Sequence, residues 1–397
     1  MAAVIDSSGV QAARPAFYND PKVRGLFYQA LVLFVTVGFG WYLVHNTMVN
    51  RARLGVASGF GFLDTTSGFD ISQSLITYSA AASTYGDAFV VGLLNTFYVA
   101  VVGIVLATII GFTMGIARLS RNWLVSRVAL VYIELIRNIP LLLQLIFWYT
   151  VVLAALPQPR DSISIFNLAY LNVRGFFVPK PIFGEGATIE ILAFGAGIVG
   201  AWALARWARI RRERTGQGFP VLWACLALII GLPILANLLL GGPITIEWPE
   251  QTKFRMQGGL VMLPEFLALA LGLSVYTGSF IAEIVRSGIL SVSKGQIEAA
   301  GALGLSPNQT LRFVVIPQAL RVIIPPQTSQ YLNLTKNSSL GVAIGYPDFF
   351  NIAGTINNQT GQAVEVIAIT MAVYLFLSLT ISLFMNWYNS RMALVER

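Results

Sequence analysis

The sequence predicts an all-α, polytopic membrane protein with about eight transmembrane helices and both termini in the cytoplasm. Three observations support this fold class: charged residues are scarce, apolar stretches are long, and Lys and Arg are unevenly distributed. Of the 397 residues, 56% are hydrophobic and 11% are charged, whereas soluble proteins have about 45–50% and about 25%. The mean hydropathy is +0.70. The surplus apolar residues therefore need lipid around them, and a soluble enzyme is excluded.

Eight apolar stretches have the length to cross a membrane as helices. About 20 residues are needed, because a rise of about 1.5 Å per residue must cover a hydrocarbon core of about 30 Å. The first stretch is expected to remain as a helix, because a polar arm precedes it and no small-residue cleavage site follows. We place the spans near residues 26–45, 89–117, 128–155, 189–208, 219–240, 264–286, 325–346 and 364–386.

The positively charged residues set the orientation of these spans, because they concentrate in cytoplasmic loops. With the N-terminus inside, 17 of the 26 Lys and Arg residues fall on the cytoplasmic side and 7 on the opposite side. The other two, Arg137 and Lys336, lie inside predicted spans. The residues behind the net charge of +8 are therefore unevenly distributed across the membrane, and this asymmetry predicts that both termini lie in the cytoplasm.

Local features of the spans and loops have structural interpretations. Pro140 is expected to kink the third span, which a bundle tolerates where neighbours satisfy the freed carbonyl. Gly111 and Gly115 have the spacing of close helix packing. The fourth and fifth spans are expected at the periphery of the bundle, with no acids or bases in their interior. Turn residues without a metal or nucleotide pattern fill the outer loops, roughly 46–88, 156–188 and 241–263.

Single residues exclude further classes of chemistry. The only cysteine, Cys225, lies in an apolar stretch, so an intramolecular disulfide is impossible and a Cys/His metal site is not expected. The only histidine, His45, ends the first apolar run and has no second imidazole to work with. The sequence also lacks the GK[ST] ending of a phosphate-binding loop. We therefore expect no catalytic or metal-binding residue, and any ATP must bind to another chain.

Two Glu-x-x-Arg pairs stand near the cytoplasmic ends of oppositely running spans. Glu134 and Arg137 lie on the third span, and Glu283 and Arg286 lie on the sixth. The two pairs can meet as an ion-paired inner gate, or each can pair locally at i,i+3 spacing. The sequence leaves both possibilities open.

Lys336 is a charged residue inside the seventh predicted span. It lies about ten residues from either end, hence about 15 Å from each edge, and the polar residues Asn337, Ser338 and Ser339 follow it. A buried ion is costly in a membrane unless it faces a pathway or a partner. Lys336 therefore either lines a translocation pathway, where it can meet an amino-acid carboxylate, or pairs with a structural acid.

A helix–glycine–helix elbow is predicted between the sixth and seventh spans. Ser293 and Gln296 have the spacing of a capping box that starts the first helix, and Gly304 can take the left-handed conformation that ends it. This helix has small residues beside a single acid, Glu298. Such a helix suits docking into a groove of another protein, or it lies on lipid.

The second helix of the elbow has its own start and stop signals. Ser306 is expected to cap its N-terminus, and Pro307 fits the first helical position, where no amide partner is needed. Pro317 lacks the N–H of a continuing helix, so we expect the chain to break there before the next span.

The elbow also resembles a known family. Glu298-Ala299-Ala300, then Gly304 after three residues and Val314 to Pro317 after nine more, resembles the EAA loop of ABC importer permeases. Val314 and Ile316 stand where that family usually has Ile and Leu. Stretches that resemble the polar-amino-acid branch of the same family are Gly92–Thr96, Tyr132–Gln144, Ala282–Ile289 and Asn333–Leu340.

The resemblance covers about residues 88–388 and implies a type I ABC importer permease core. The extra first span and a long segment at about 157–262 with two additional helices are similar to the long permease subunits of two kinds of importer: general L-amino-acid importers, and glutamate/glutamine/aspartate/asparagine importers. We favour the general L-amino-acid type, as its Q-type permease. The implied organisation is a cytoplasmic arm, first helix and periplasmic loop in residues 1–88, a permease domain in 89–388 and a cytoplasmic tail in 389–397.

The resemblance also implies partners and roles. Such a subunit is similar to others that pair with a second related permease, two copies of an ATPase and a periplasmic amino-acid-binding protein in the bacterial inner membrane. The chain itself is then not an enzyme and holds no cofactor, since ATP and Mg²⁺ belong to the ATPase. The EAA loop of the family docks into the ATPase. The implied coupling residues are Glu298, Ala299, Ala300, Gly304 and Pro317, and the pathway or gate residues are Glu134, Arg137, Glu283, Arg286, Lys336, Asn337, Ser338 and Ser339.

A self-sufficient, ion-coupled secondary amino-acid transporter is the main alternative. It is expected to have inverted repeats or paired broken helices around a midplane site. The sequence has neither, and the elbow is then unexplained. A membrane-embedded enzyme is less favoured, because no metal set or activated Ser or Cys constellation is present.

Overall fold

The computed structural model describes most of the chain, and most of what it describes is helical, as the predicted fold class requires. The first part of the predicted arm and the last residues of the predicted tail lie outside the described residues, which are 21–55, 58–184, 186–241, 244–252 and 256–392.

Two helices form the centre of the molecule. α2 (Tyr85–Arg118) starts at a capping box of Thr84 and Asp87 and packs along α7 (Pro264–Leu290). A Cβ atom on Gly111 would lie 2.4 Å from the Ile281 side chain, and one on Gly115 would lie 2.6 Å from the Ala282 carbonyl oxygen. The absence of both side chains lets the two helices approach this closely, which confirms the predicted packing.

The third predicted span is sharply bent. α3 (Trp123–Asn138) is followed by α4 (Leu141–Phe147) and the π-helical turn η3 (Trp148–Leu153), with a bend of 106° between the two parts. Pro140 lies at the break, as predicted. The Gln144 amide nitrogen donates hydrogen bonds to the Ile136 and Ile139 carbonyl oxygens, both at 2.9 Å, so the carbonyl groups that the bend exposes are satisfied.

The C-terminal part of the bundle contains α10 (Ile316–Asn337), the 3-10 segment η6 (Ser338–Ile344), α11 (Phe349–Thr360) and α12 (Ala363–Met392). α10 packs against α7 and α12. The predicted span at 325–346 had the wrong bounds: the α-helix begins at Ile316 and ends at Asn337, and Gly345, with φ +77°, turns the chain into α11.

The number of spans stays unconfirmed. Among the described residues, six helices are long and apolar enough to cross a membrane, and the bent pair brings the number to as many as seven. The seventh predicted span corresponds to α10, which is not among them. Its Gln, Thr, Ser and Asn side chains make it too polar for that criterion, although it is packed inside the bundle.

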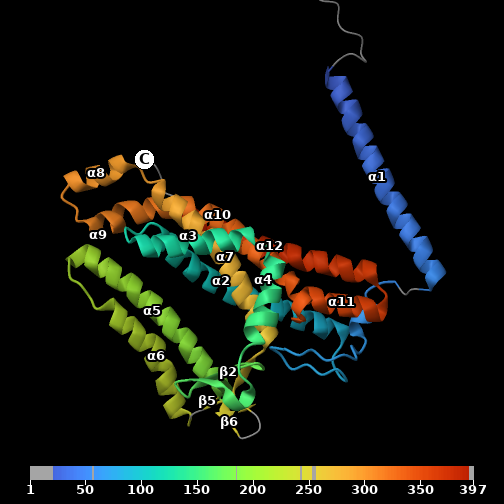
Figure 1. Ribbon diagram of the computed structural model, residues 1–397, viewed down its shortest axis with the longest axis horizontal. Coiled ribbons are helices and arrows are strands. Elements are labelled where there is room, and N and C mark those ends of the chain that lie inside the picture. The colour runs from blue at the N-terminus through green and yellow to red at the C-terminus, as the bar shows by residue number, and fades with distance from the viewer. Residues whose placement is uncertain (1–20, 56–57, 185, 242–243, 253–255, 393–397) are drawn as a thin grey trace, which may run out of the picture.

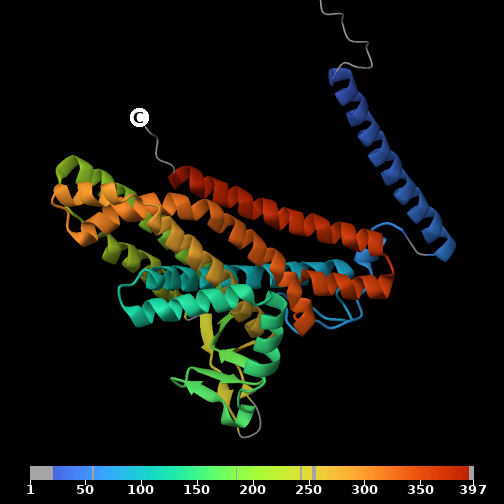
Figure 2. The same ribbon diagram turned by 45° about the horizontal axis from the view of Figure 1, so that its top comes forward.

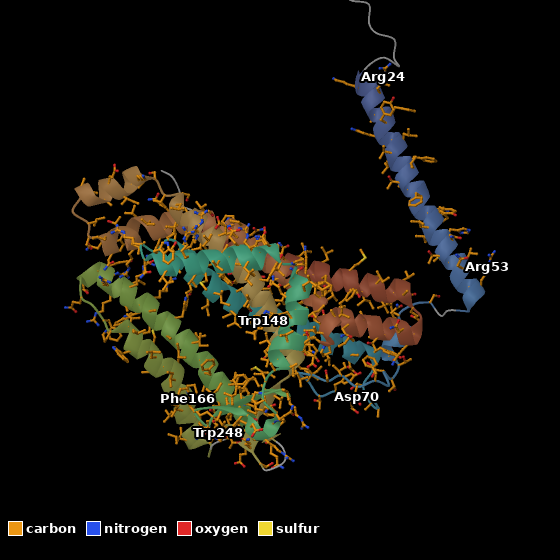
Figure 3. All side chains as sticks on the ribbon, in the orientation of Figure 1. Arg24, Arg53, Asp70, Trp148, Phe166 and Trp248 are labelled. Atoms are coloured by element: carbon orange, nitrogen blue, oxygen red, sulfur yellow. The ribbon has the colours of Figure 1, made fainter. Side chains whose placement is uncertain are left out.

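The outer segments contain small antiparallel sheets where only turns were expected. One sheet has the strand order β1-β2-β3-β8, and two further pairs are β4 with β5 and β6 with β7. The strands have two to four residues each, too few for an alternating pattern to stand out in the sequence. Their bounds are β1 (Ile163–Ile165), β2 (Ala169–Asn172), β3 (Gly175–Val178), β4 (Lys180–Phe183), β5 (Ile244–Glu247), β6 (Glu250–Gln251), β7 (Met256–Gln257) and β8 (Leu260–Met262). Figure 3 places Phe166 and Trp248 in this region.

A helical hairpin connects the strands of this region. α5 (Ala187–Thr215) and α6 (Val221–Leu239) pack on each other rather than on the bundle (Figure 1). The expectation that their interior holds no acid was wrong. Glu190 is buried, and its two carboxylate oxygens accept hydrogen bonds from the Asn237 side chain at 3.2 and 3.1 Å. The pairing satisfies a carboxylate that the apolar hairpin otherwise leaves without a partner.

α1 (Pro21–Leu54) stands apart from the bundle in both views (Figures 1 and 2). Arg24 and Arg53 lie near its two ends (Figure 3), and no part of its apolar stretch is buried. Charged ends and an apolar middle fit a membrane-spanning helix whose surface faces lipid or another chain.

The α2–α7 contact gives a first prediction. Gly111→Ala is expected to destabilise the protein by about 1–3 kcal/mol, because the added methyl group collides with Ile281. Gly195→Ala in α5 is the matched control, since nothing lies within 4 Å of the added carbon. The thermal unfolding midpoint of the purified protein in detergent measures both. A drop for Gly195→Ala as large as that for Gly111→Ala would contradict this account of the packing.

Candidate functional site

The elbow protrudes at one end of the molecule. α8 (Lys294–Ala302) ends at Gly304, which has φ +78°, and α9 (Pro307–Thr310) follows. The sequence predicted this left-handed turn. Of the residues of α8, only Ala300 is buried, whereas Glu298 and Ala299 are exposed. The first helix of the elbow therefore presents an acid and small side chains to whatever lies beyond this end of the molecule (Figure 1).

The predicted N-cap at Ser306 and the predicted capping box at Ser293 have different outcomes. Ser306 and Gln309 form the full box: the Ser306 hydroxyl accepts from the Gln309 amide, and the Gln309 side chain accepts from the Ser306 amide. The box predicted for Ser293 and Gln296 was wrong, because the Ser293 side chain makes no capping bond. The Gln296 side chain oxygen instead accepts from the Gln318 side chain at 3.5 Å, which links α8 to α10.

The predicted break at Pro317 was also wrong. The backbone stays helical from α9 through a π-helical turn, η5 (Leu311–Val315), into α10. The Ile316 amide donates to the Leu311 carbonyl, five residues back. This wider turn accommodates the proline, which has no N–H to contribute and whose ring crowds the preceding turn. One helical path therefore runs from Pro307 at the elbow to Asn337 inside the bundle.

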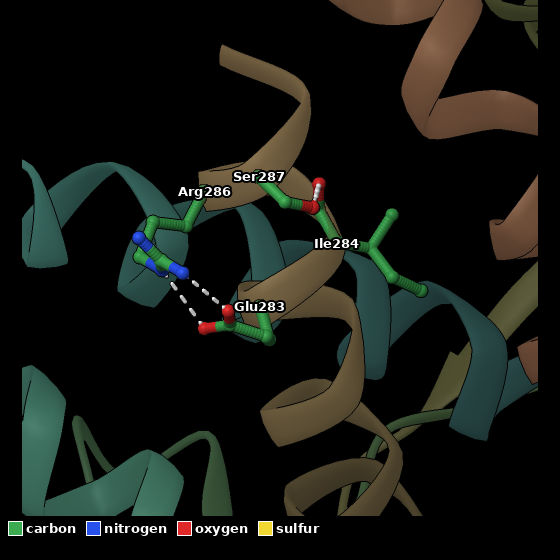
Figure 4. Close-up of polar contacts among 4 residues, drawn as sticks. All are labelled: Glu283, Ile284, Arg286 and Ser287. Carbon is green, nitrogen blue, oxygen red and sulfur yellow. Dashed lines mark hydrogen bonds and ion pairs between the residues drawn. The ribbon is translucent and has the colours of Figure 1, made fainter. Parts of the chain in front are cut away.

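Glu283 and Arg286 form a local ion pair. The guanidinium contacts both carboxylate oxygens, at 2.5 and 2.9 Å (Figure 4). Arg137 of α3 lies over the Phe280 ring of α7, with its guanidinium carbon 5.2 Å from the ring centre. Glu134 is exposed. Among the described residues no ion pair joins α3 to α7, so the two motifs lie on neighbouring helices without pairing with each other.

The prediction that Lys336 lies in the middle of a helix was wrong, because Lys336 lies in the last turn of α10. Its side chain is exposed and makes no ion pair within the part of the chain that the structure describes. It lines a cavity of about 470 Å³ between α10, α11 and α12. The Ser339 hydroxyl, which also lines this cavity, donates to the Lys336 carbonyl at 2.9 Å, whereas Ser338 is buried and Asn337 is half-buried. The cavity is lined by Lys336, Ser339, Phe350, Thr370, Met371, Tyr374, Leu375 and Ser378.

A buried carboxylate supports the wall of this cavity. Asp348 caps α11 by accepting from the Asn351 amide at 2.9 Å, and its other oxygen accepts from the Tyr374 hydroxyl at 3.2 Å. Burial raises the pKa of Asp348 to about 6, because the surrounding protein disfavours the charged form. The carboxyl group thus fixes Tyr374, which lines the cavity, relative to α11.

Two polar positions on α2, Asn95 and Thr96, belong to the Gly92–Thr96 stretch, but the sequence analysis gave them no role of their own. Asn95 donates to the Pro347 carbonyl at 2.9 Å, and the Thr96 hydroxyl accepts from the Phe349 amide at 2.9 Å. Both side chains are fully buried, and they hold the turn between η6 and α11 against α2. A pair of adjacent polar residues inside an apolar span was the available signal.

The elbow gives a second prediction. Ser306→Ala is expected to weaken the start of α9 by about 1 kcal/mol, because it removes a capping bond. Ser293→Ala is the matched control, since that hydroxyl caps nothing. Hydrogen–deuterium exchange of the amides after Pro307 should rise in the first variant and stay unchanged in the second. Equal exchange in both variants would refute the assignment of the caps.

Comparison with known proteins identifies relatives across the whole chain. Residues 103–394 match the family model of the binding-protein-dependent transport system inner membrane component. The general L-amino acid transport system permease protein AapQ of Rhizobium johnstonii is 56% identical over 384 residues, 97% of this chain and 96% of that protein. The putative amino-acid ABC transporter permease protein YhdX of Escherichia coli is 51% identical, over 96% and 97%. The glutamate/glutamine/aspartate/asparagine transport system permease protein BztB of Rhodobacter capsulatus is 40% identical, over 95% and 96%.

Proposed function

The chain belongs to the family of binding-protein-dependent transport system inner membrane components, and on that premise we propose that it is the long permease subunit of a broad-specificity L-amino-acid importer. The family makes it a multi-pass membrane subunit of an ABC transporter and a transport protein rather than an enzyme. The general L-amino-acid permease is 56% identical and the glutamate-type permease 40% identical. This difference supports the broad-specificity type.

The proposed importer contains this chain, a second homologous permease, a dimer of ABC ATPases and a periplasmic amino-acid-binding protein. ATP and Mg²⁺ belong to the ATPase. In the bacterial inner membrane both termini face the cytoplasm. This orientation is supported by the excess of Lys and Arg on that side. The division into residues 1–88, a permease domain at 89–388 and a tail at 389–397 is part of the same proposal.

The exposed surface of α8 is the observation that carries the coupling role. Glu298 and Ala299 project from a short helix of which Ala300 alone is buried, so a groove on the ATPase can receive it. Gly304 forms the turn of the elbow, and Pro317 lies in the helix that follows it. The continuous helix from Pro307 to Asn337 spans about 45 Å at helical rise. A displacement of the elbow is therefore transmitted towards the cavity beside Lys336 along one helical path, which contains Pro325 and Pro326.

The translocation pathway is proposed to include Lys336, Asn337, Ser338 and Ser339, with the Glu283–Arg286 pair and the neighbouring Glu134 and Arg137 as an inner gate. An unpaired cation beside a cavity fits the carboxylate of an amino acid. The gate would open by exchange of the local Glu283–Arg286 pair for contacts with α3, since Arg137 lies over Phe280, one turn from Glu283.

Reconstitution tests the function and separates it from a secondary transporter. Liposomes that contain the chain with its co-purified partners and enclosed ATP are expected to take up labelled L-amino acids when the binding protein is added. The chain alone is expected to take up none under an ion gradient. Ion-driven uptake by the chain alone would establish the secondary transporter instead.

The coupling role gives a third prediction. Glu298→Lys is expected to abolish ATP-driven uptake, because a cation replaces the single acid of the docking helix, while the amount of protein in the membrane stays the same. Glu250→Lys, an exposed acid at the opposite end of the molecule, is the control and should transport normally. Normal uptake by Glu298→Lys would remove α8 from the ATPase interface.

The cavity gives a fourth prediction. Lys336→Met keeps the length of the side chain and removes its charge, so uptake is expected to fall about tenfold or more, as for loss of a charged hydrogen bond. Complex assembly, measured by size-exclusion chromatography after affinity purification, should not change. If the complex instead falls apart, Lys336 is a structural residue and the pathway does not need it.

A further inference from the structure

The end of α7 opposite the elbow borders two cavities. One, of about 510 Å³, is lined by Arg174 and Glu265 together with Ser72, Phe177 and Gly345; the other, of about 540 Å³, is lined by Glu265 with Tyr149 and Val173. Both volumes fall in the range of about 300–1,000 Å³ that is usual for small-molecule sites. Glu265 stands between them. Because α7 is about 40 Å long at helical rise and the elbow follows its other end, these cavities face the side away from the proposed ATPase.

Arg174 is held at this mouth by the geometry of the small sheet. It lies in the tight turn between β2 and β3, where its amide donates to the Asn172 side chain at 2.8 Å. The next residue, Gly175, has φ +126°, and a Cβ atom there would collide with the Met262 carbonyl oxygen. β3 pairs with β8 directly before α7 begins. The turn therefore lies against the start of α7, and Arg174 shares the cavity with Glu265.

The two charges are available for a ligand. One oxygen of Glu265 accepts from the Tyr149 hydroxyl at 2.8 Å, and the other has no hydrogen-bond partner among the described residues. The Arg174 guanidinium is exposed and makes no ion pair or hydrogen bond in that same part of the chain. An acid and a base that share one cavity without pairing leave space between them for a group that carries both charges.

We propose that Glu265 and Arg174 form an extracytoplasmic binding site for a zwitterionic α-amino acid. The Glu265 carboxylate accepts from the α-ammonium group, and the Arg174 guanidinium donates to the α-carboxylate, which it can bind in a bidentate manner. Tyr149 orients the Glu265 carboxylate. This inference rests on the proposed function, because it takes the imported amino acid as its ligand.

Recognition of the two charged groups explains how one site accepts many amino acids. The ammonium and carboxylate groups are common to all of them, whereas the side chain differs. The apolar wall formed by Phe177, Val261 and Leu263 can accommodate different side chains, because apolar contacts discriminate by only about 1–3 kcal/mol per methylene. The two charged residues thus bind the ammonium and carboxylate groups of the ligand and do not select its side chain.

Binding measurements on the assembled importer test the site. The complex of permeases and ATPase, without the binding protein, is mixed with a radiolabelled L-amino acid, and the dissociation constant is measured for wild type, Glu265→Gln and Arg174→Gln. Each variant is expected to raise it about tenfold or more. Glu250→Gln and Lys180→Gln, exposed residues in β6 and β4, are the controls and should leave it unchanged.

Modified ligands assign each charge to its partner. The wild type is expected to bind the N-acetyl derivative and the methyl ester of the amino acid more weakly than the free amino acid. Glu265→Gln should lose the discrimination against the N-acetyl derivative only, and Arg174→Gln should lose that against the methyl ester only. A purely structural role of either residue would not produce this matched pattern.

Three results would overturn the site: no binding to the wild type, wild-type affinity in both variants, or unchanged amino-acid binding with a weaker affinity for the binding protein. The third would make Arg174 and Glu265 a docking surface for that protein. A wild-type complex that fails to import any amino acid when ATP and the binding protein are present refutes the proposed function instead. The two failures are therefore distinguishable.

Discussion

At Gly111 and Gly115 the backbone of α2 lies directly against α7, and the arrangement of the bundle around these two helices depends on this contact. α7 carries Glu265 at one end and the Glu283–Arg286 pair near the other, and the elbow begins just beyond it. α2 in turn holds the turn before α11 through Asn95 and Thr96. A shift between α2 and α7 would therefore displace the outer cavities, the inner ion pair and the wall of the Lys336 cavity together. Close packing of this kind resists gradual deformation. We therefore expect a conformational change to move the surrounding helices relative to α2 and α7.

The need to satisfy backbone polar groups away from water explains the irregular features of the bundle. At the 106° bend, Gln144 binds the carbonyl groups that the missing helical hydrogen bonds leave free. At Pro317 the chain forms a π-turn instead of a break, so the backbone stays helical from the elbow into α10. The two prolines thus have opposite effects. Pro140 comes where a glutamine can compensate for a sharp turn, and Pro317 comes where a wider helical turn preserves a continuous helix.

Local chemistry made some of these features predictable from the sequence, and long-range contacts decided the rest. The left-handed turn at Gly304 and the N-cap at Ser306 depend on neighbouring residues alone, and Gly111 and Gly115 have a spacing that by itself indicates packing; all were predicted. The capping box of Ser293 was not formed: the Gln296 amide donates to the Ser293 carbonyl, and the Gln296 side chain pairs with Gln318, which is 22 residues away. α10 was displaced in the prediction, because it contains polar residues, of which Gln327 and Thr335 are buried among other helices, and so does not appear as one long apolar stretch. Strands of two to four residues leave no periodic pattern, so the sheet that positions Arg174 could not be foreseen.

The segment between η3 and α7 sets this chain apart from a minimal bundle, and its contacts indicate why it is present. Its hairpin, α5 and α6, packs on itself, with Glu190 and Asn237 paired inside it, and contributes little to the core. The strand β3, by contrast, is attached to the start of α7, because it pairs with β8 and because Gly175 packs closely against Met262. An insertion that only anchored the protein in lipid would not need this attachment. An insertion that supplies one half of a two-charge site must be held rigidly against the helix that supplies the other half. The attachment therefore favours a role beside the start of α7. There the bundle provides Glu265 and Tyr149, and the cation of the proposed site, Arg174, comes from the inserted segment.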